Sequence, residues 1–488
     1  MRKIILLFTL VMLMGSLQAQ RLQANLSYAK FYHPELGSYI ETYLSVDAAG
    51  VDLVEIKKGE YQAKVNLLLM FKRNDSIIDY SKTQLSSPVI TDTLAVHFNF
   101  LDQQRFFLPN GGYTLEIEFQ DASKDADPSI SSTNIDLYFT DDKVQLSDVE
   151  LLSSYEKSTE WKVNTKNGFD MIPYNSTFFP ETVDKITYYA EIYNVAKVLG
   201  EKEKFLLTAF ISNENDDQPI KSLVIRRRMD AQEVNVILSQ FDLSKLASGN
   251  YYLNIEIRNR NNEVLTGNKS FFQVSNPSVI FDNNILAKIE AGNSFVTKFS
   301  EDSLNYLIKS FMPIANGIEK SFITNSLGNV SKEQKQKFMA FFWDSRDEVN
   351  PEHAWKKYHV EVLKTNRSFG NKYEPGYTTD RGRVYLQFGE PNTISDQSFE
   401  TGGGRHDGSV PYQIWHYYNI GNQRDGKFVF YNPHLIPNGY TLLHSNVIGE
   451  VNNPHWQVYL RRNQLESIDA SEYDVYGGRS GELYNNPR

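Results

Sequence analysis

The sequence predicts a multidomain, mainly β protein with two tandem immunoglobulin-like β-sandwiches, a helical segment and a C-terminal α+β domain. Apolar and polar residues alternate from about residue 22 to 274, which is the period of half-buried strands. The phrase Leu108–Glu118 matches Leu246–Glu256 without a gap, 138 positions later. After Pro277 the hydrophobic period changes from 2 to about 3.6, as in amphipathic helices. These three observations give the order of the domains.

The first nineteen residues predict a secretory signal peptide, residues 1–19. Arg2 and Lys3 precede an apolar run from Ile4 to Met14, and Ala19 is a small residue near the expected cleavage site. We therefore expect an exported protein. An apolar run of about eleven residues is too short to cross a bilayer, which needs about 20, so no transmembrane anchor is expected.

Composition restricts the function further. The 488 residues include no cysteine, which excludes disulfides, thiolate metal sites and lipid attachment through a cysteine. The formal net charge of -10 argues against nucleic acid as a partner. The length is sufficient for about three domains that each bury a core of their own.

The repeat defines the two sandwiches, which we expect at residues 20–142 and 143–277. In each copy a turn with glycine leads into a strand, and a polar turn and a last strand follow. Tyr113 and Tyr251 occupy the same position in the two copies. Both tyrosines should begin a late strand, with the leucine two positions later facing the core.

A helical segment is expected at residues 278–370. Ser300 precedes an amphipathic stripe with acidic residues in its first turn, and Ser331 begins a capping box. Asn350 followed by Pro351 gives an N-cap with proline at the first helical position. Three helices should therefore begin at these caps.

The C-terminal α+β domain is expected at residues 371–467, followed by an extended tail at 468–488 with little apolar periodicity. Asn438–Gly439 is a strong turn signal between two predicted strands. Four short runs rich in aromatic and β-branched residues predict strands at Tyr412–Tyr418, Lys427–Tyr431, Tyr440–Val447 and Trp456–Leu460.

The segment Pro375–Pro391, PGYTTDRGRVYLQFGEP, resembles the hallmark of the GWxTD domain family of bacterial, Bacteroidetes-type envelope proteins. Tyr377 stands where that family usually has tryptophan. The resemblance covers the region from about Tyr358 to Leu460. It implies an envelope protein, and the family has no enzymatic activity that could be assigned to this chain by resemblance. The motif and the aromatic strand after it are also similar to a capped helix, Gly-x-Pro turn and Trp-Tyr strand in small outer-membrane assembly proteins of the SmpA/OmlA type.

Two local structures fit the motif equally well. In the first, Asp380 caps a short helix, Val384 and Phe388 face the core, and Gly389 ends the helix. In the second, Val384 and Phe388 belong to a strand in which apolar and polar residues alternate.

The candidate site consists of polar and aromatic side chains in and after the motif. They could bind an anionic or polar ligand through the arginines. Alternatively, Asp380 satisfies free backbone N–H groups and the arginines pair with Glu374 or Glu390. No catalytic constellation, metal site or cofactor site is expected, because the sequence lacks the residue spacings that are typical of such sites. The candidate binding residues are Tyr377, Asp380, Arg381, Arg383, Trp415, His416 and His444.

These features predict an exported cell-envelope binding or scaffolding protein without catalysis, which supports outer-membrane assembly or secretion. Its partners would be envelope proteins, outer-membrane associated. The alternative is a hydrolase that acts on envelope glycan or peptide, with Asp380, His416 and His444 as acid–base candidates. The two hypotheses differ in whether those three side chains meet in one pocket.

Overall fold

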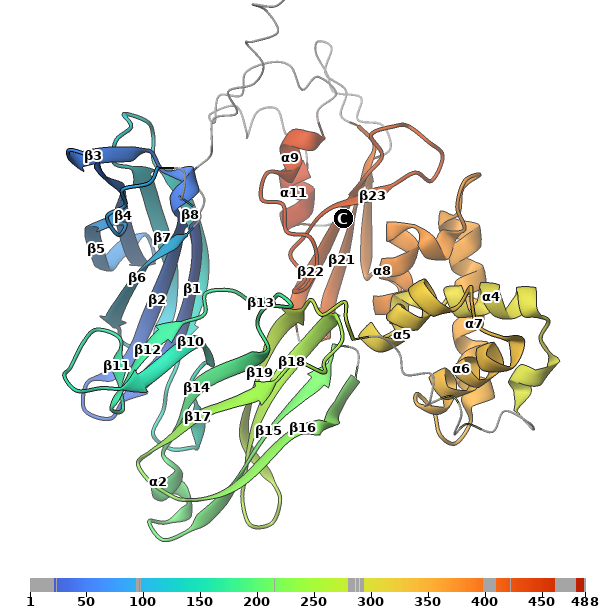
Figure 1. Ribbon diagram of the computed structural model, residues 1–488, viewed down its shortest axis with the longest axis horizontal. Coiled ribbons are helices and arrows are strands. Elements are labelled where there is room, and N and C mark those ends of the chain that lie inside the picture. The colour runs from blue at the N-terminus through green and yellow to red at the C-terminus, as the bar shows by residue number, and fades with distance from the viewer. Residues whose placement is uncertain are drawn as a thin grey trace, which may run out of the picture.

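The structure is a computed structural model (Figure 1). It describes residue 22 and residues 24–486, except for positions 94–95, 97, 215, 280–285, 287–288, 290–293, 398–409, 422 and 461–479. The predicted signal peptide and its cleavage site before Gln20 lie outside the described residues. The described chain is mainly β, as predicted, with antiparallel sheets followed by a helical part and an α+β part.

The first sandwich packs two sheets face to face (blue in Figure 1). Residues at alternate positions of both sheets fill its core, because successive side chains of a strand point to opposite faces. One sheet has the order β1 (Ala24–His33), β2 (Gly37–Asp47) and β6 (Asn99–Phe107). The other has the order β3 (Leu53–Lys57), β4 (Glu60–Arg73), β7 (Gly111–Asp121) and β8 (Ser129–Leu137), with β5 (Ser76–Ser86) also paired to β4.

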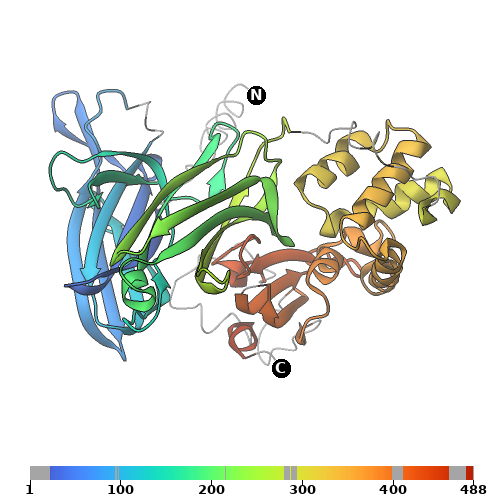
Figure 2. The same cartoon turned by 90° about the horizontal axis from the view of Figure 1, so that it is seen from below.

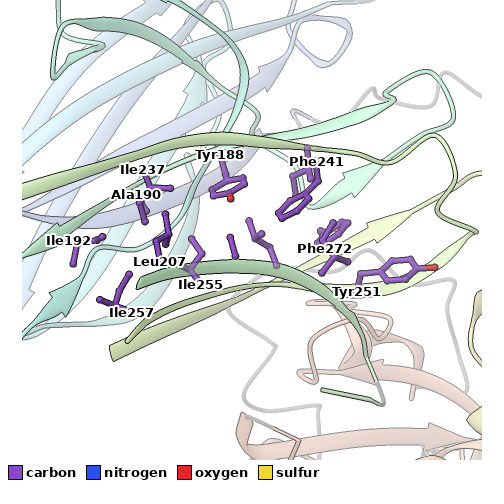
Figure 3. Packing of buried hydrophobic residues seen from close by; sticks show 14 of the residues in the cluster. Tyr188, Ala190, Ile192, Leu207, Ile237, Phe241, Tyr251, Ile255, Ile257 and Phe272 are labelled. Atoms are coloured by element: carbon purple, nitrogen blue, oxygen red, sulfur yellow. The ribbon is translucent and has the colours of Figure 1, made fainter. Parts of the chain in front are cut away.

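The second sandwich repeats this two-sheet architecture (green in Figure 1), and Figure 3 shows side chains of both its sheets meeting in the core. One sheet has the order β11 (Thr165–Lys166), β12 (Phe169–Pro173), β10 (Glu150–Lys157), β14 (Lys185–Tyr193) and β17 (Val234–Asp242), with β9 (Gln145–Leu146) paired to β14. The other has the order β13 (Phe178–Phe179), β19 (Val264–Val274), β18 (Gly249–Arg258), β15 (Lys204–Asn213) and β16 (Asp216–Asp230).

The predicted equivalence of Tyr113 and Tyr251 is visible in their hydrogen bonds. The Tyr113 hydroxyl donates to the carbonyl of Pro109 at 2.5 Å, and the Tyr251 hydroxyl donates to the carbonyl of Ala247 at 2.9 Å. Each acceptor lies four residues upstream. A tyrosine bonded back to the preceding corner is typical of immunoglobulin-like sandwiches. The leucine two positions after each tyrosine is fully buried, as predicted.

The two sandwiches are joined by a buried seam. Strands β2 and β14 are buried on both faces, because one face packs in its own sandwich and the other packs on the neighbouring one. Phe31 and Tyr39 from the first sandwich meet Met171 and Tyr189 from the second. This contact between the two sandwiches was not predicted from the sequence.

The helical part follows the second sandwich (yellow and orange in Figure 1). The hydroxyl of Ser300 accepts from Ser303 N, Ser331 forms a capping box with Gln334, and Asn350 caps the last helix, so the three predicted helix starts are confirmed. No helix among the described residues is both long and apolar enough to cross a membrane. The principal elements are α4 (Glu301–Lys309), α5 (Gly317–Ser321), the π-helical η4 (Phe322–Ser326), α6 (Lys332–Asp344) and α7 (Pro351–Phe369).

The last part is an antiparallel sheet covered on both faces. Helices α7 and α8 pack on one face, while α9 and α11 pack on the other. The sheet has the order β20 (Thr393–Gln397), β21 (Tyr412–Ile420), β22 (Gln423–Tyr431) and β23 (Thr441–Ser445). Its helical elements are the 3-10 turn η5 (Gly376–Thr378), α8 (Asp380–Phe388), α9 (Trp456–Tyr459) and α11 (Ser480–Asn485).

Two expectations for this part are wrong. The run Trp456–Leu460 was predicted as a strand, but it forms α9, which buries Trp456 and Leu460 on one side. Trp456 and Leu460 are four positions apart, and so short a run is compatible with both the helical period of 3.6 and the strand period of 2. The expected extended tail contains α11, whose Leu483 is buried against the sheet. The tail residues 468–479 lie outside the described residues.

The helical part and the last part both contact the second sandwich, which lies between the last part and the first sandwich (Figure 2). A Cβ added at Gly317 would come within 2.0 Å of the carbonyl oxygen of Ser248, so α5 begins directly against the loop before β18. A Cβ at Gly449 would lie 3.0 Å from the ring of Phe271 in β19. Two backbone segments therefore contact the second sandwich. A larger residue has no room at Gly317, and at Gly449 it would require the ring of Phe271 to shift.

Candidate functional site

The motif forms a capped helix, so the helical alternative is right and the strand alternative is wrong. The cap is Thr379 and not Asp380: the Thr379 hydroxyl accepts from Gly382 N at 3.1 Å. Gly389 ends the helix with φ +84°, and its N–H donates to the Tyr385 carbonyl at 2.8 Å. This end was predicted, since glycine adopts positive φ at little cost.

Asp380 is the first residue of α8 and connects the helix to the sheet. Its Oδ2 accepts from the backbone N–H of Leu442 in β23 at 2.7 Å. Asp380 was expected to satisfy free N–H groups at the start of its own helix, but it satisfies the N–H of a strand residue 62 positions away. The carboxylate also lies in the first turn of the helix, where the helix dipole favours negative charge.

Arg381 is buried, with only 4% of its surface exposed. Its guanidinium lies 5.1 Å from the ring of Phe369 and 4.1 Å from the ring of Tyr440, which are favourable distances for cation–π contact. The same group donates to Oε1 of Gln413 and to Oδ1 of Asn438, each at 3.1 Å. Arg381 thus joins α8 to β21 and to the loop before β23.

The expected pairing of Arg381 with Glu374 or Glu390 is wrong. Glu374 accepts from Asn371, and Glu390 pairs with Lys364 at 3.4 Å. Among the described residues, Nε of Arg381 has no hydrogen-bond partner. Burial lowers the pKa of the guanidinium to about 10. Amide oxygens and aromatic rings hold this cation in place of a carboxylate.

Arg383 pairs with a carboxylate that is distant in the sequence. Its Nη1 and Nη2 donate to the two oxygens of Glu450 at 2.7 and 2.8 Å, a bidentate arrangement. Burial lowers the pKa of Arg383, but the hydrogen bonds and charge of Glu450 outweigh it and raise the pKa. Glu450 follows Gly449, the residue that touches the second sandwich. The ion pair therefore connects the motif to the loop at the domain contact.

Tyr377, in the position of the family's usual tryptophan, fills space between helices. Its exposed fraction is 7% and its ring meets Tyr306 of α4 edge to face at 5.8 Å. Its backbone N–H donates to Oδ1 of Asn366 in α7 at 3.1 Å. Trp415 is fully buried, and its indole N–H donates to Gln413 at 3.2 Å. Both aromatic candidates are part of the core beneath the motif.

The two candidate histidines lie on the opposite face of the sheet from α8. His416 on β21 pairs through Nε2 with Asp425 at 2.5 Å. His444 on β23 accepts from Asn453 N at 3.1 Å through Nδ1, and its Nε2 lies 3.0 Å from the Tyr484 hydroxyl. Burial lowers the pKa of His444 to about 4. The neutral imidazole is thus the form that fits this site.

These three acid–base candidates do not converge. Strand β22 separates the strands of His416 and His444, so the two imidazoles do not lie on adjacent strands. Asp380 lies on the helix that covers the other face of the sheet. In the part of the chain that the structure describes, no group of three or more His, Asp and Glu side chains is arranged to hold a metal ion.

Several residues that complete the site were not expected. Thr379, Gln413, Asn438 and Glu450 form its hydrogen bonds, and none of them stands out in the sequence as chemically special. Asn438 was noticed only as a turn residue, and its φ of +58° confirms that turn. Long-range partners of this kind have no local signal.

Comparison with known proteins identifies one domain. Residues 306–457 match the sequence model of the GWxTD domain family. The match begins at Tyr306, well before the expected limit near Tyr358, and thus includes the end of α4 and all of α6 and α7. No curated protein matches the chain.

Solved structures resemble the chain only distantly. A red sea bream transglutaminase is 12% identical over 52% of this chain, with a TM-score of 0.17, and the match spans 31% of the transglutaminase. Fibronectin(III)-like modules of Clostridium thermocellum CbhA are 12% identical over 48% of this chain and 86% of theirs, with a TM-score of 0.14. A protein of unknown function from Porphyromonas gingivalis W83 is 10% identical over 52% of this chain and 99% of its own, with a TM-score of 0.15. The family match shows that this chain contains a GWxTD domain at residues 306–457.

Proposed function

We propose that this chain is an exported binding or scaffolding protein of the cell envelope, which supports outer-membrane assembly or secretion by holding envelope protein partners. The observation that supports this proposal most directly is that the charged residues of the motif make structural contacts. Asp380 binds the backbone of β23, and Arg383 binds Glu450 beside the domain contact. The charges of the motif thus hold the domain together and connect it to its neighbour.

The rest of the chain supports a scaffolding role. The first two sandwiches share a buried aromatic seam, and the GWxTD domain contacts the second sandwich through Gly317 and Gly449. Buried apolar contacts and close backbone contacts of this kind restrict motion between domains. Such a body holds its surfaces at fixed positions, which is what a scaffold requires.

An open strand edge provides a surface for a partner. Strand β16 is fifteen residues long and, among the described residues, pairs with β15 on one side, so it is an edge strand of its sheet. Arg226, Arg227 and Arg228 are exposed on this strand. An extended, acidic segment of a partner would extend the sheet and neutralise these arginines. Charged side chains on an edge strand also oppose pairing with a second copy of the same strand. A partner that binds this edge must therefore carry the opposite charge.

Affinity capture tests the proposal. The tagged protein is expressed in its own envelope, solubilised in mild detergent and captured, and retained proteins are quantified by mass spectrometry. We expect at least one envelope protein in a fixed ratio. The double change Arg226→Glu and Arg228→Glu should reduce that ratio at least tenfold, while Lys58→Glu, an exposed site on the first sandwich, should not. A captured chain without a partner would contradict the function, and equal capture by the double variant would contradict the surface.

A further inference from the structure

A lysine is enclosed between two carboxylates at the seam of the sandwiches. The side chain of Lys166 is 3% exposed, and its Nζ lies 2.6 Å from Oε2 of Glu41. The same Nζ contacts Oε2 of Glu150. Glu41 belongs to β2 of the first sandwich, whereas Glu150 and Lys166 belong to β10 and β11 of the second. The amine therefore meets both acids only where the two sandwiches are docked.

The surroundings of this lysine are apolar. Its Nζ lies 4.4 Å from the ring of Phe31 and 5.2 Å from the ring of Tyr189. Buried leucine and methionine side chains complete the cluster. Removing charged groups from water costs several kcal/mol per ion, so a reaction that discharges this pair is favoured by the site.

The two carboxylates have different roles. Oε1 of Glu41 accepts from Nε and Nη2 of Arg105 at 2.8 and 2.5 Å, and its Oε2 accepts from the Tyr43 hydroxyl at 2.7 Å. Burial opposes its ionisation, but Lys166 and Arg105 outweigh burial and lower the pKa of Glu41.

Glu150 is held by fewer partners. Its Oε1 is buried and has no hydrogen-bond partner among the described residues. Burial raises the pKa of Glu150, which favours its neutral acid form. A neutral carboxylic acid is an electrophile, whereas a carboxylate that is fully hydrogen-bonded to cations is a base. Glu41 and Glu150 thus differ in the way that acyl transfer to an amine requires.

We propose that Lys166 and Glu150 become joined by an amide bond between Nζ and the side-chain carboxyl carbon, with Glu41 as the group that moves the protons. Lys166 and Glu150 begin as an ammonium and a carboxylate, and Glu41 carries one proton from the ammonium to Glu150, which gives a free amine and a neutral acid. The amine attacks the carboxyl carbon, and Glu41 takes a second proton from the attacking nitrogen and gives it to the departing hydroxyl, so the C–O bond breaks and water leaves. One ammonium and one carboxylate thus become one amide and one water, and Glu41 ends as the carboxylate that it was at the start.

The product suits the seam better than the reactants do. The reaction removes one buried positive and one buried negative charge, and the ion pair of Arg105 with Glu41 stays balanced. The amide N–H points to the Glu41 oxygen that the ammonium now contacts. The bond closes a loop between strands β10 and β11 and reduces the freedom of the unfolded chain. Since Glu41 comes from the other sandwich, the bond forms only after docking.

Peptide mapping of the purified full chain tests the bond. Trypsin should release residues 144–157 linked to residues 163–185, with no cleavage at Lys166, and the intact mass should be lower by one water than the sequence requires. The chain has no cysteine, so no disulfide can link two peptides. A linear peptide 144–157 together with cleavage at Lys166 would overturn the proposal, and no variant is needed for that outcome.

Variants test the roles of Lys166, Glu150 and Glu41 in forming the bond. Lys166→Met removes the amine and should abolish the linked pair, while Lys162→Met, a neighbouring lysine that pairs with Asp170 at 2.9 Å, should retain it. Glu150→Gln should give a linked product of the same mass as the wild type, because ammonia leaves in place of water. Glu41→Gln should slow formation of the link at least tenfold in refolded protein. Linkage at the wild-type rate in Glu41→Gln would overturn the role of Glu41.

Discussion

Arg383 and Glu450 form a bidentate ion pair that connects the motif helix to the loop resting on the second sandwich, with N–O distances of 2.7 and 2.8 Å. The pair is largely shielded from water, since the Glu450 side chain is 10% exposed and that of Arg383 is 31% exposed. An arginine of the motif thus acts on a domain contact 67 positions away.

Removing one partner of this pair should destabilise the protein. Glu450→Gln should cost about 1–3 kcal/mol, because Arg383 keeps its charge in a poorly hydrated place. Glu390→Gln is the control, since its pair with Lys364 is 3.4 Å long, with side chains that are 74% and 50% exposed. That change should cost about 0–1 kcal/mol. Urea unfolding of both variants measures the difference, and equal losses would show that the pair has no special role.

Two motif glycines allow a close approach of backbones. A Cβ at Gly382 would lie 1.8 Å from the carbonyl oxygen of Gly376, which cannot move without breaking η5. Gly382→Ala should therefore cost roughly 4 kcal/mol or more. Gly328→Ala is the control, because no atom lies within 4 Å of its added Cβ, and its cost should stay within about 0.5 kcal/mol. A native-like melting temperature for Gly382→Ala would contradict the packing described here.

Local features of this fold were predictable because their causes lie within a few residues. Ser300, Ser331 and Asn350 cap helices through side chains that reach the next three residues. The cap at the motif was misplaced by one position, since Thr379 and Asp380 are both good cap residues. The choice between them depends on Leu442, which binds Asp380 from a distant strand. Sequence alone does not contain that contact.

The two sandwich tyrosines should contribute equally to stability. Tyr113→Phe and Tyr251→Phe should each cost about 1 kcal/mol, because each leaves a corner carbonyl without its donor. Tyr80→Phe is the control, since Tyr80 is 63% exposed, and should be neutral. Equilibrium unfolding in urea compares the three variants. A clear loss in only one sandwich would show that the two corners differ in energy as well as in sequence.

The seam between the sandwiches has a signal in the sequence of strand β14. Strand β14 contains the run Ile186–Tyr193, in which Tyr188 and Tyr189 are both fully buried. Apolar and aromatic residues occupy adjacent positions there, at Tyr188, Tyr189 and Ala190, which is typical of a strand that is buried on both faces. The partner of the second face, β2, could not be identified, because a pattern along one strand carries no information about its neighbour in another domain.

Acid should weaken the last domain through His444. Folding lowers its pKa from 6.5 to about 4, so the unfolded chain binds more protons in this interval. The stabilisation is complete above pH 6.5 and is lost as the pH falls toward 4. Protonation also removes the Nδ1 acceptor for Asn453 N. Melting curves should show this loss in the wild type and a smaller one in His444→Gln. The exposed His455→Gln serves as control, and an unchanged pH slope in His444→Gln would refute the assignment.

The central claim is that Asp380, Arg381 and Arg383 of the motif act structurally, by holding the domain in place. Asp380→Ala tests it most directly, with Asp380→Asn as the control that keeps an acceptor for Leu442 N. Thermal melting and envelope capture are measured on the same preparations. We predict that Asp380→Ala loses about 1–3 kcal/mol and that its capture of partners falls only in proportion to the folded fraction. An Asp380→Ala protein that melts like the wild type but captures no partner would contradict the claim.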